Sequence, residues 1–172
     1  MDYRHTIEDS KGGLETLASK IPGYRGYKEK EGRRAADKLL REHLASQLNE
    51  QQRTLAELQR DLLEGGGLLL MDDLERAVTK VQNLADKVRT ASYGYAGLFD
   101  EIKVKEEELD ALYDFDESLL GYVSAIQAAI DALVAAMDAS GDVKAAIRDV
   151  VSAAEEANAT WRQRESTITG AV

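Results

Sequence analysis

The chain has 172 residues, 44% of them apolar and 31% charged, and its 32 acidic and 22 basic side chains give a net charge of −10. This length is enough for one domain with a core of its own. The absence of cysteine excludes disulfides, thiolate metal sites and thiol nucleophiles. No run approaches the roughly 18 apolar residues of a membrane span. Asp2 follows Met1 without an apolar segment, so we also expect no secretory signal.

The composition predicts an all-α protein. There is a single proline, Pro22, while alanine, leucine, glutamate and aspartate dominate. Alternating apolar and polar stretches rich in β-branched residues are missing, so we expect no sheet. Residues 1–26 are predicted to be a lead-in segment with a short amphipathic helix that ends at Ile21-Pro22-Gly23. Gly23 and Gly26 then favour a kinked connector.

A long helix is predicted from about Tyr27 to Leu63. Steps of four and three separate the members of its apolar stripe, which is the heptad spacing of a bundle seam. The stripe consists of Leu44, Leu48, Gln51, Leu55, Leu58 and Leu62. We interpret Gln51 as a residue that fixes helix register. The triglycine at 65–67 ends the helix with a flexible turn.

Three more amphipathic helices follow: from about Asp72 to Tyr95, from Lys105 to Ala139, and from a cap at Asp142 to residue 166. Their turns are mostly short, so residues 27–166 are predicted to form an antiparallel four-helix bundle with long heptad-patterned helices. Residues 167–172 are predicted to be a frayed tail. A homodimer of long hairpins, swapped at the triglycine, is the structural alternative.

This topology predicts that two charged blocks lie side by side at one end of the bundle. Residues 25–41, the basic block, hold seven basic and three acidic side chains, and residues 100–117, the acidic block, hold nine acidic and two basic ones. Most aromatic residues gather there too: Tyr24, Tyr27, Tyr93, Tyr95, Phe99, Tyr113 and Phe115. The blocks could pair with each other and fix the topology. Alternatively, arginines remain free for an anionic ligand or an acidic partner.

Asp116 falls within the apolar stripe of the third long helix. A buried carboxylate without a partner would cost several kcal/mol, so we expect a cation from the first long helix to pair with it. The candidates are Arg33, Arg34, Lys38 and Arg41, and we predict a structural ion-pair network of Asp116, Lys38 and Arg41. The alternatives are a carboxylate that binds a ligand or metal, or a helix cap after a break at 113–116.

No catalytic motif is present, which favours a non-enzymatic protein without cofactor or metal. No glutamate lies three residues before either histidine, as a di-iron bundle would require. The chain also lacks a phosphate-binding glycine loop and a nucleophile elbow. His43 beside Leu44 is interpreted as a helix-flank residue. A carboxylate site for Mg²⁺ or Ca²⁺ in the acidic block would have no motif spacing.

Two stretches carry a resemblance. One is Ile-Pro-Gly-Tyr-Arg-Gly-Tyr-Lys-Glu-Lys-Glu at 21–31, which continues to Arg41. The other is Tyr-Gly-Tyr-Ala-Gly-Leu-Phe-Asp at 93–100, followed by Leu-Tyr-Asp-Phe-Asp at 112–116. Together they resemble an uncharacterised prokaryotic family of small helical proteins. The resemblance implies a cytoplasmic, prokaryotic protein and adds no catalytic residue.

The leading hypothesis is an interaction or scaffold protein that docks another protein through this end. Arginine and aromatic residues are the usual anchors of such surfaces, and the candidate contacts are Tyr24, Tyr27, Arg33, Arg34, Tyr95 and Phe99. The net charge argues against nucleic acid. A second hypothesis is a bundle, or an enzyme, that binds a small molecule or anion in a pocket around Asp116. A third is peripheral membrane binding through residues 7–21, which the acidity and the weak polar face disfavour.

Overall fold

The computed structural model describes residues 3–91 and 106–169, and the regular secondary structure of these residues is entirely helical. They contain five α-helices and no strand, as the composition predicts. Two short 3-10 turns, η1 (Lys30–Gly32) and η2 (Leu68–Leu70), precede the second and third helices. The α-helices are α1 (Tyr3–Lys20), α2 (Arg33–Glu64), α3 (Met71–Thr90), α4 (Glu106–Asp138) and α5 (Val143–Thr169).

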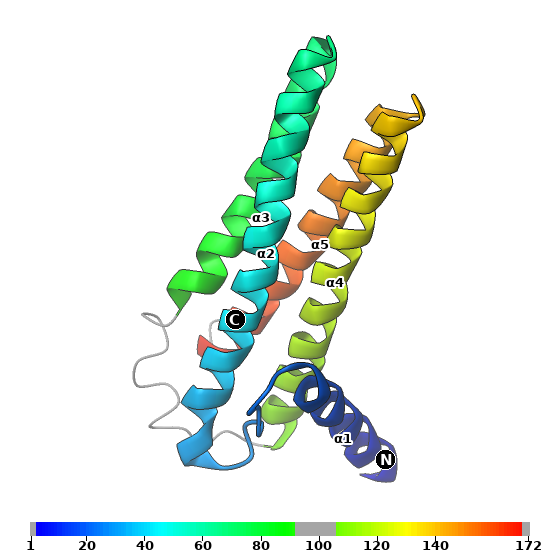
Figure 1. Cartoon of the computed structure of the whole chain (residues 1–172). Helices are drawn as coiled ribbons and strands as arrows, with labels where there is room; N and C mark the ends of the chain where they lie inside the picture. Colours follow the sequence, from blue (N-terminus) through cyan, green and yellow to red (C-terminus); the bar gives the residue numbers. More distant parts are fainter. Residues whose placement is uncertain (1–2, 92–105, 170–172) are drawn as a thin grey trace.

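The long helices are arranged as two pairs (Figure 1). One pair is α2 with α3 and the other is α4 with α5, and each pair is joined by a short turn at its upper tip. Between the pairs, α3 packs against α5 and α2 packs against α4, while α1 lies across the lower part of α4. The two pairs lie farther apart at their upper tips than in their lower part (Figure 1).

The predicted apolar stripe of the first long helix is buried in α2. All six of its members are at most 8% exposed, including Gln51 at 2%. In α4 the stripe buries Leu119, Val123 and Ile126, and Asp116 among them is completely buried. The stripe residues therefore supply the core, because they follow one side of each helix.

Two boundaries differ from the sequence prediction. α2 begins at Arg33 rather than Tyr27. Residues 27–29 form bends and η1 occupies Lys30–Gly32, so the first turns predicted for the helix are not α-helical. Tyr27 therefore belongs to the connector, directly after Gly26 with its φ of +81°. α1 begins at Tyr3 and runs through Gly12 and Gly13, so it is longer than the short helix expected from the sequence. A Cβ on Gly13 would lie 3.4 Å from the Tyr113 Cβ, so α1 and α4 are close neighbours at this position.

The turns at the upper tips use residues that the sequence analysis identified. Gly66 has a φ of +81°, and a side chain on Gly67 would overlap that of Leu62, so the triglycine turn folds tightly back on α2. At the other tip, the Ala145 N–H donates to Asp142 Oδ1 at 3.0 Å. This bond confirms Asp142 as the N-cap of α5.

One segment of α4, Leu109–Asp138, is long and apolar enough to cross a membrane by length and composition. An 18-residue window within it has a mean hydropathy of 1.7, and 33% of that window is buried in the structure. From the sequence we expect no run that approaches the length of a membrane span, whereas this window meets the criterion of mean hydropathy. Core helices of soluble proteins pass the same criterion, so this is weak support for a membrane span.

Candidate functional site

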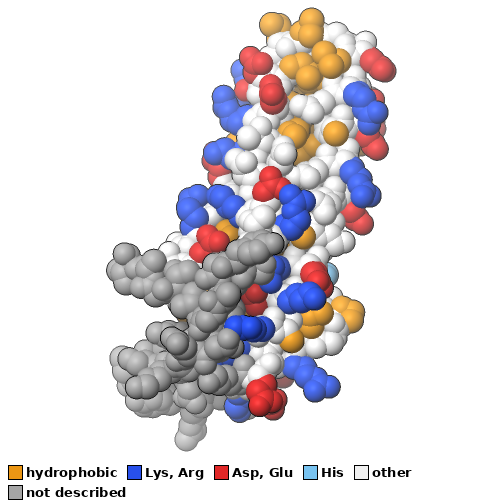
Figure 2. Space-filling model, turned by 90° about the vertical axis from the view of Figure 1, so that its left-hand side faces the viewer, with side chains coloured by type: hydrophobic (Ala, Val, Ile, Leu, Met, Phe, Trp, Pro, Cys, Tyr) orange, Lys and Arg blue, Asp and Glu red, His pale blue; other side chains and the backbone are white. Residues whose placement is uncertain are grey.

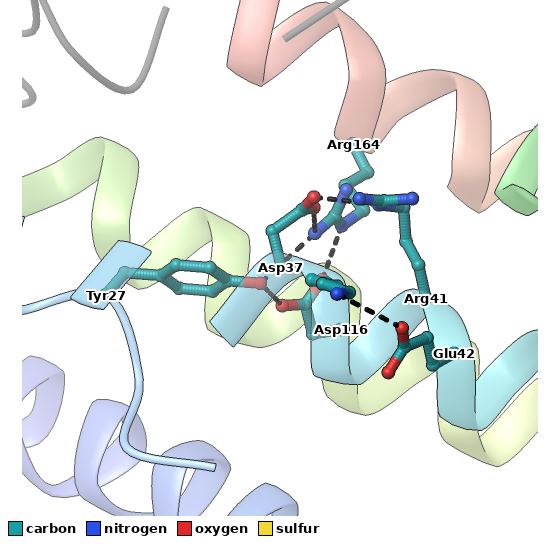
Figure 3. Close-up of polar contacts among 7 residues, drawn as sticks. Tyr27, Asp37, Arg41, Glu42, Asp116 and Arg164 are labelled. Carbon is teal, nitrogen blue, oxygen red and sulfur yellow. Dashed lines mark hydrogen bonds and ion pairs between the residues drawn. The ribbon is translucent and has the colours of Figure 1, made fainter. Parts of the chain in front are cut away.

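Polar side chains from four segments meet inside the lower part of the molecule (Figure 3). They are Tyr27 from the connector, Asp37 and Arg41 from α2, Asp116 from α4 and Arg164 from α5. We call these five residues the buried polar cluster. Tyr27, Asp116 and Arg164 have no exposed surface, and Asp37 is 2% exposed. These four residues therefore join segments that are far apart in the chain, away from solvent.

Arg164 lies at the centre of the buried polar cluster. Its Nε donates to Asp116 Oδ1 at 2.6 Å, and its Nη2 donates to Asp37 Oδ1 at 2.7 Å and to the Tyr27 hydroxyl oxygen at 3.1 Å. The Tyr27 hydroxyl in turn donates to Asp116 Oδ2. Both carboxylate oxygens of Asp116 therefore accept hydrogen bonds, one from a cation and one from a phenol.

Arg41 completes the cluster at its edge. Its Nε donates to Asp37 Oδ2 at 2.8 Å, and the Arg41 side chain is 12% exposed. Two arginines thus face two aspartates, and the formal charges cancel. A balanced set of hydrogen-bonded charges is the arrangement in which burial of ions is tolerated, whereas a lone buried ion is not. The cluster fixes the relative positions of the connector, α2, α4 and α5.

Aromatic rings surround the cluster. The Arg164 guanidinium lies 5.1 Å from the ring centroid of Trp161, within range of a cation–π interaction. The rings of Tyr27 and Tyr113 are 5.4 Å apart, and the Tyr113 hydroxyl accepts the Tyr27 backbone N–H at 2.7 Å. Arg33 Nε donates to the Tyr27 carbonyl at 2.7 Å. The connector is thereby held at its backbone as well as at its side chain.

The pKa values of these groups follow from burial. Burial raises the pKa of the Tyr27 hydroxyl well above its ordinary value, and the negative charge of Asp116 raises it further. Tyr27 therefore stays neutral and keeps the proton that it donates. Burial also raises the pKa of the Asp116 carboxyl, while the charge of Arg164 and the hydrogen bond from Tyr27 oppose that rise. The ion pair with Arg164 and the hydrogen bond from Tyr27 both favour the charged form of Asp116.

The structure corrects the predicted partner of Asp116. The partner is Arg164 of α5, not a cation of the first long helix. Lys38 is instead paired with Glu42 at 3.7 Å, with a side chain that is 68% exposed, and lies outside the cluster. Arg41 does belong to the cluster, but through Asp37. The predicted network of Asp116, Lys38 and Arg41 is therefore right in two of its members and wrong in Lys38.

The structure also corrects the predicted docking surface. Tyr24 is 5% exposed, Tyr27 is completely buried and Arg33 is 8% exposed, so none of the three can serve as a surface contact. They are buried because the connector folds inward over the cluster. Arg34 is exposed. Tyr95 and Phe99 lie outside the described residues.

Sequence reasoning missed Arg164 and Asp37, although a signal for both was present. The stripe of α5 reaches Trp161, and one further step of three positions gives Arg164. The stripe of α2 extends backward through Leu40, and one further step of three gives Asp37. Charged residues in core register on separate helices predict a buried ion pair, so continuing both stripes would have found it.

The described residues show no site for a metal. No group of three or more histidine, cysteine, aspartate or glutamate side chains among them could hold one, and part of the acidic block lies outside those residues. Two surface grooves flank α2, and neither is lined by Asp116. One is lined by Lys38, Arg41, Glu42, Ala45 and Arg89, and the other lies between α2 and α4.

Comparisons of the chain with protein-family models, with curated proteins and with solved structures found no match. The resemblance of residues 21–41 and 93–116 to a prokaryotic family therefore stays a prediction, and the function has to be argued from the chain itself.

Proposed function

We propose that this protein is a non-enzymatic helical interaction protein that docks an acidic segment of another protein on its basic block. The observation that carries the proposal is a group of exposed cations on the connector and on the first turns of α2. These are Arg25, Lys28, Arg34 and Lys38. Nearby, Lys38, Arg41 and Arg89 line a groove of about 300 Å³ together with Glu42 and Ala45. Basic side chains are interspersed with acidic ones on the face drawn in Figure 2. Glu29 and Glu31 of the same stretch are also exposed, but cations prevail over residues 25–41, and exposed cations suit carboxylates of a partner.

The buried polar cluster supports this role by holding the cations in place. Arg33 is bound to the connector carbonyl of Tyr27, and Arg41 is bound to Asp37 at 2.8 Å. The exposed cations next to these residues therefore project from a backbone that several segments fix. A preorganised surface loses less entropy when it binds, and this favours recognition by a rigid patch over capture by a flexible tail.

We infer the antiparallel four-helix bundle of α2 to α5 as the scaffold. The order in which α3 packs on α5 and α2 packs on α4 supports it. A small-molecule pocket around Asp116 has less support. Its carboxylate is completely buried and both of its oxygens accept hydrogen bonds from neighbouring side chains, so a ligand would have to displace strong charge-assisted bonds.

The test is the affinity of a fluorescein-labelled glutamate-rich peptide, measured by anisotropy at two ionic strengths. The variant Arg34→Glu/Lys38→Glu reverses two charges of the basic block. The control Arg53→Glu/Arg60→Glu reverses two exposed arginines farther up the same helix, with the same change in net charge. We expect the first variant to bind at least about tenfold more weakly, a loss of about 1.4 kcal/mol, while the control stays close to wild type.

Circular dichroism and melting curves of both variants show whether each remains folded. Equal losses in the two variants would mean that only net charge matters, and the basic block would not be the docking site. Native-lysate capture with the same pair of variants then identifies the natural partner. A protein retained by wild type and by the control but lost by Arg34→Glu/Lys38→Glu is the expected result.

A further inference from the structure

The outer face of α4 is lined by small side chains. Residues that alternate by four and three positions are exposed along it: Gly121, Ala125, Ala128, Ala132 and Ala135. We call them the small-residue stripe. This spacing follows one side of a helix, and side chains of this size let the backbone of a second helix come close.

The middle of α4 is more apolar than is usual for a helix with this much exposed surface. Only 33% of its 18-residue apolar window is buried inside the structure. An amphipathic surface helix normally has a charged outer face. Asp131 is the only charged residue between Leu119 and Ala136, so the face that carries the small-residue stripe is poor in charge and suits contact with another helix.

A groove of about 430 Å³ between α2 and α4 runs beside the stripe, and Ala128 of the stripe is part of its wall. Gln47 and Gln51 of α2 line the groove from the other side. Gln51 is 2% exposed, and its Nε2 donates to the Val123 carbonyl at 2.8 Å, but its Oε1 has no hydrogen-bond partner. Gln47 Oε1 is also buried without a partner. Buried oxygens of this kind call for an N–H donor.

The charged residues around the groove indicate which kind of N–H donor it would bind. Glu50 and Asp131 line it, and no lysine or arginine does. α4 itself contains nine acidic residues and no basic residue over its 33 positions. Two buried acceptors bordered by two carboxylates suit a guanidinium or ammonium group, which supplies N–H donors and positive charge together.

We propose that the small-residue stripe and the α2–α4 groove bind an amphipathic helix of a partner protein, with arginine or lysine side chains that reach Gln51 and Asp131. A second copy that packs stripe to stripe would bring together two helices whose charged residues are all acidic, and these would repel each other. Lipid tails could cover the stripe, but they offer no donor to Gln47 and Gln51. This acidic site is separate from the basic block, so the protein would have docking surfaces of opposite charge.

The probe is a fluorescein-labelled peptide of about three heptads with alanine and leucine in the seam and arginine at the flanks. Its twin carries glutamate in place of arginine. Two variants test the site. Ala125→Lys/Ala132→Lys places bulk and positive charge on the stripe. Gln51→Met keeps the shape of the side chain but removes the acceptor oxygen, together with the donor to the Val123 carbonyl. The control Gln82→Lys/Ser152→Lys makes the same charge change at exposed positions of α3 and α5.

We expect wild type and the control to bind the arginine peptide and not the glutamate twin. Ala125→Lys/Ala132→Lys should bind at least about tenfold more weakly, and Gln51→Met about three- to tenfold more weakly, with each variant folded by circular dichroism. Equal binding by Ala125→Lys/Ala132→Lys and the control would overturn the proposal. So would sedimentation that shows a dimer dependent on the stripe, or flotation of wild type with lipid vesicles.

Discussion

Asp116→Asn is the change that should affect the interior most. Asp116 is completely buried and accepts from Tyr27 and Arg164, and a hydrogen bond to a charged group contributes about 1.5–3 kcal/mol. The amide of asparagine keeps one acceptor oxygen but loses the charge that faces Arg164. Because Arg164 retains its bond to Asp37, we expect a loss of about 3 kcal/mol, at the low end of the range for a broken buried pair.

The assay is urea unfolding followed by circular dichroism, with thermal melting beside it. A loss of about 3 kcal/mol corresponds to a fall of about 6–12 °C in the melting temperature of a chain this long. The control Asp131→Asn changes an exposed carboxylate of the same helix and should stay within about 0.5 kcal/mol of wild type. A loss below about 1 kcal/mol for Asp116→Asn would refute the reasoning, because a completely buried, charge-paired carboxylate cannot be lost so cheaply.

Three smaller predictions concern the same region and can be measured by unfolding. Tyr27→Phe should cost about 2 kcal/mol, since it removes a donor to a buried carboxylate, and no loss would contradict that bond. Gly26→Ala should destabilise, because φ is +81° and its Cβ would overlap the Tyr113 hydroxyl, whereas Gly121→Ala, with open space around it, should gain about 0.5–1 kcal/mol. Partial burial, and secondarily a nearby lysine, lowers the pKa of His43. The unfolded chain therefore binds that proton more readily, and wild type should lose stability below about pH 6.5 that His43→Gln keeps.

The helices could be predicted because the apolar stripes are regular. Every member of the stripe from Leu44 to Leu62 is buried, and the turns at 65–67 and at Asp142 fall where glycine and a capping carboxylate indicate them. The residue at which a helix begins was harder to predict than its apolar stripe. Nothing in the local pattern at Tyr27 opposes a helix, and only the left-handed Gly26 and the inward fold of the connector place its ring in the core.

The candidate site was only partly predictable, because it depends on pairs across helices. A stripe indicates that Asp116 is buried and needs a partner, but not which helix supplies the partner. The sequence also does not distinguish a buried tyrosine from an exposed one. The ring can pack in a core as an apolar group, and the hydroxyl can form hydrogen bonds either in the core or at the surface. The cluster around Arg164 satisfies the hydroxyl of Tyr27, and this favours burial over a surface position.

The most direct measurement is the affinity of the glutamate-rich peptide for two variants. One is Tyr27→Phe/Asp116→Leu/Arg164→Met, which replaces the centre of the buried polar cluster with apolar side chains of similar size, a change that proteins often tolerate. The other is Arg34→Glu/Lys38→Glu. If the apolar side chains hold the connector and α2 in place as the cluster does, and the basic block binds, the first variant stays folded and binds like wild type, while the second remains folded and loses the peptide. Loss of binding in a folded first variant, with binding retained in the second, would contradict the assignment of function to the exposed basic block.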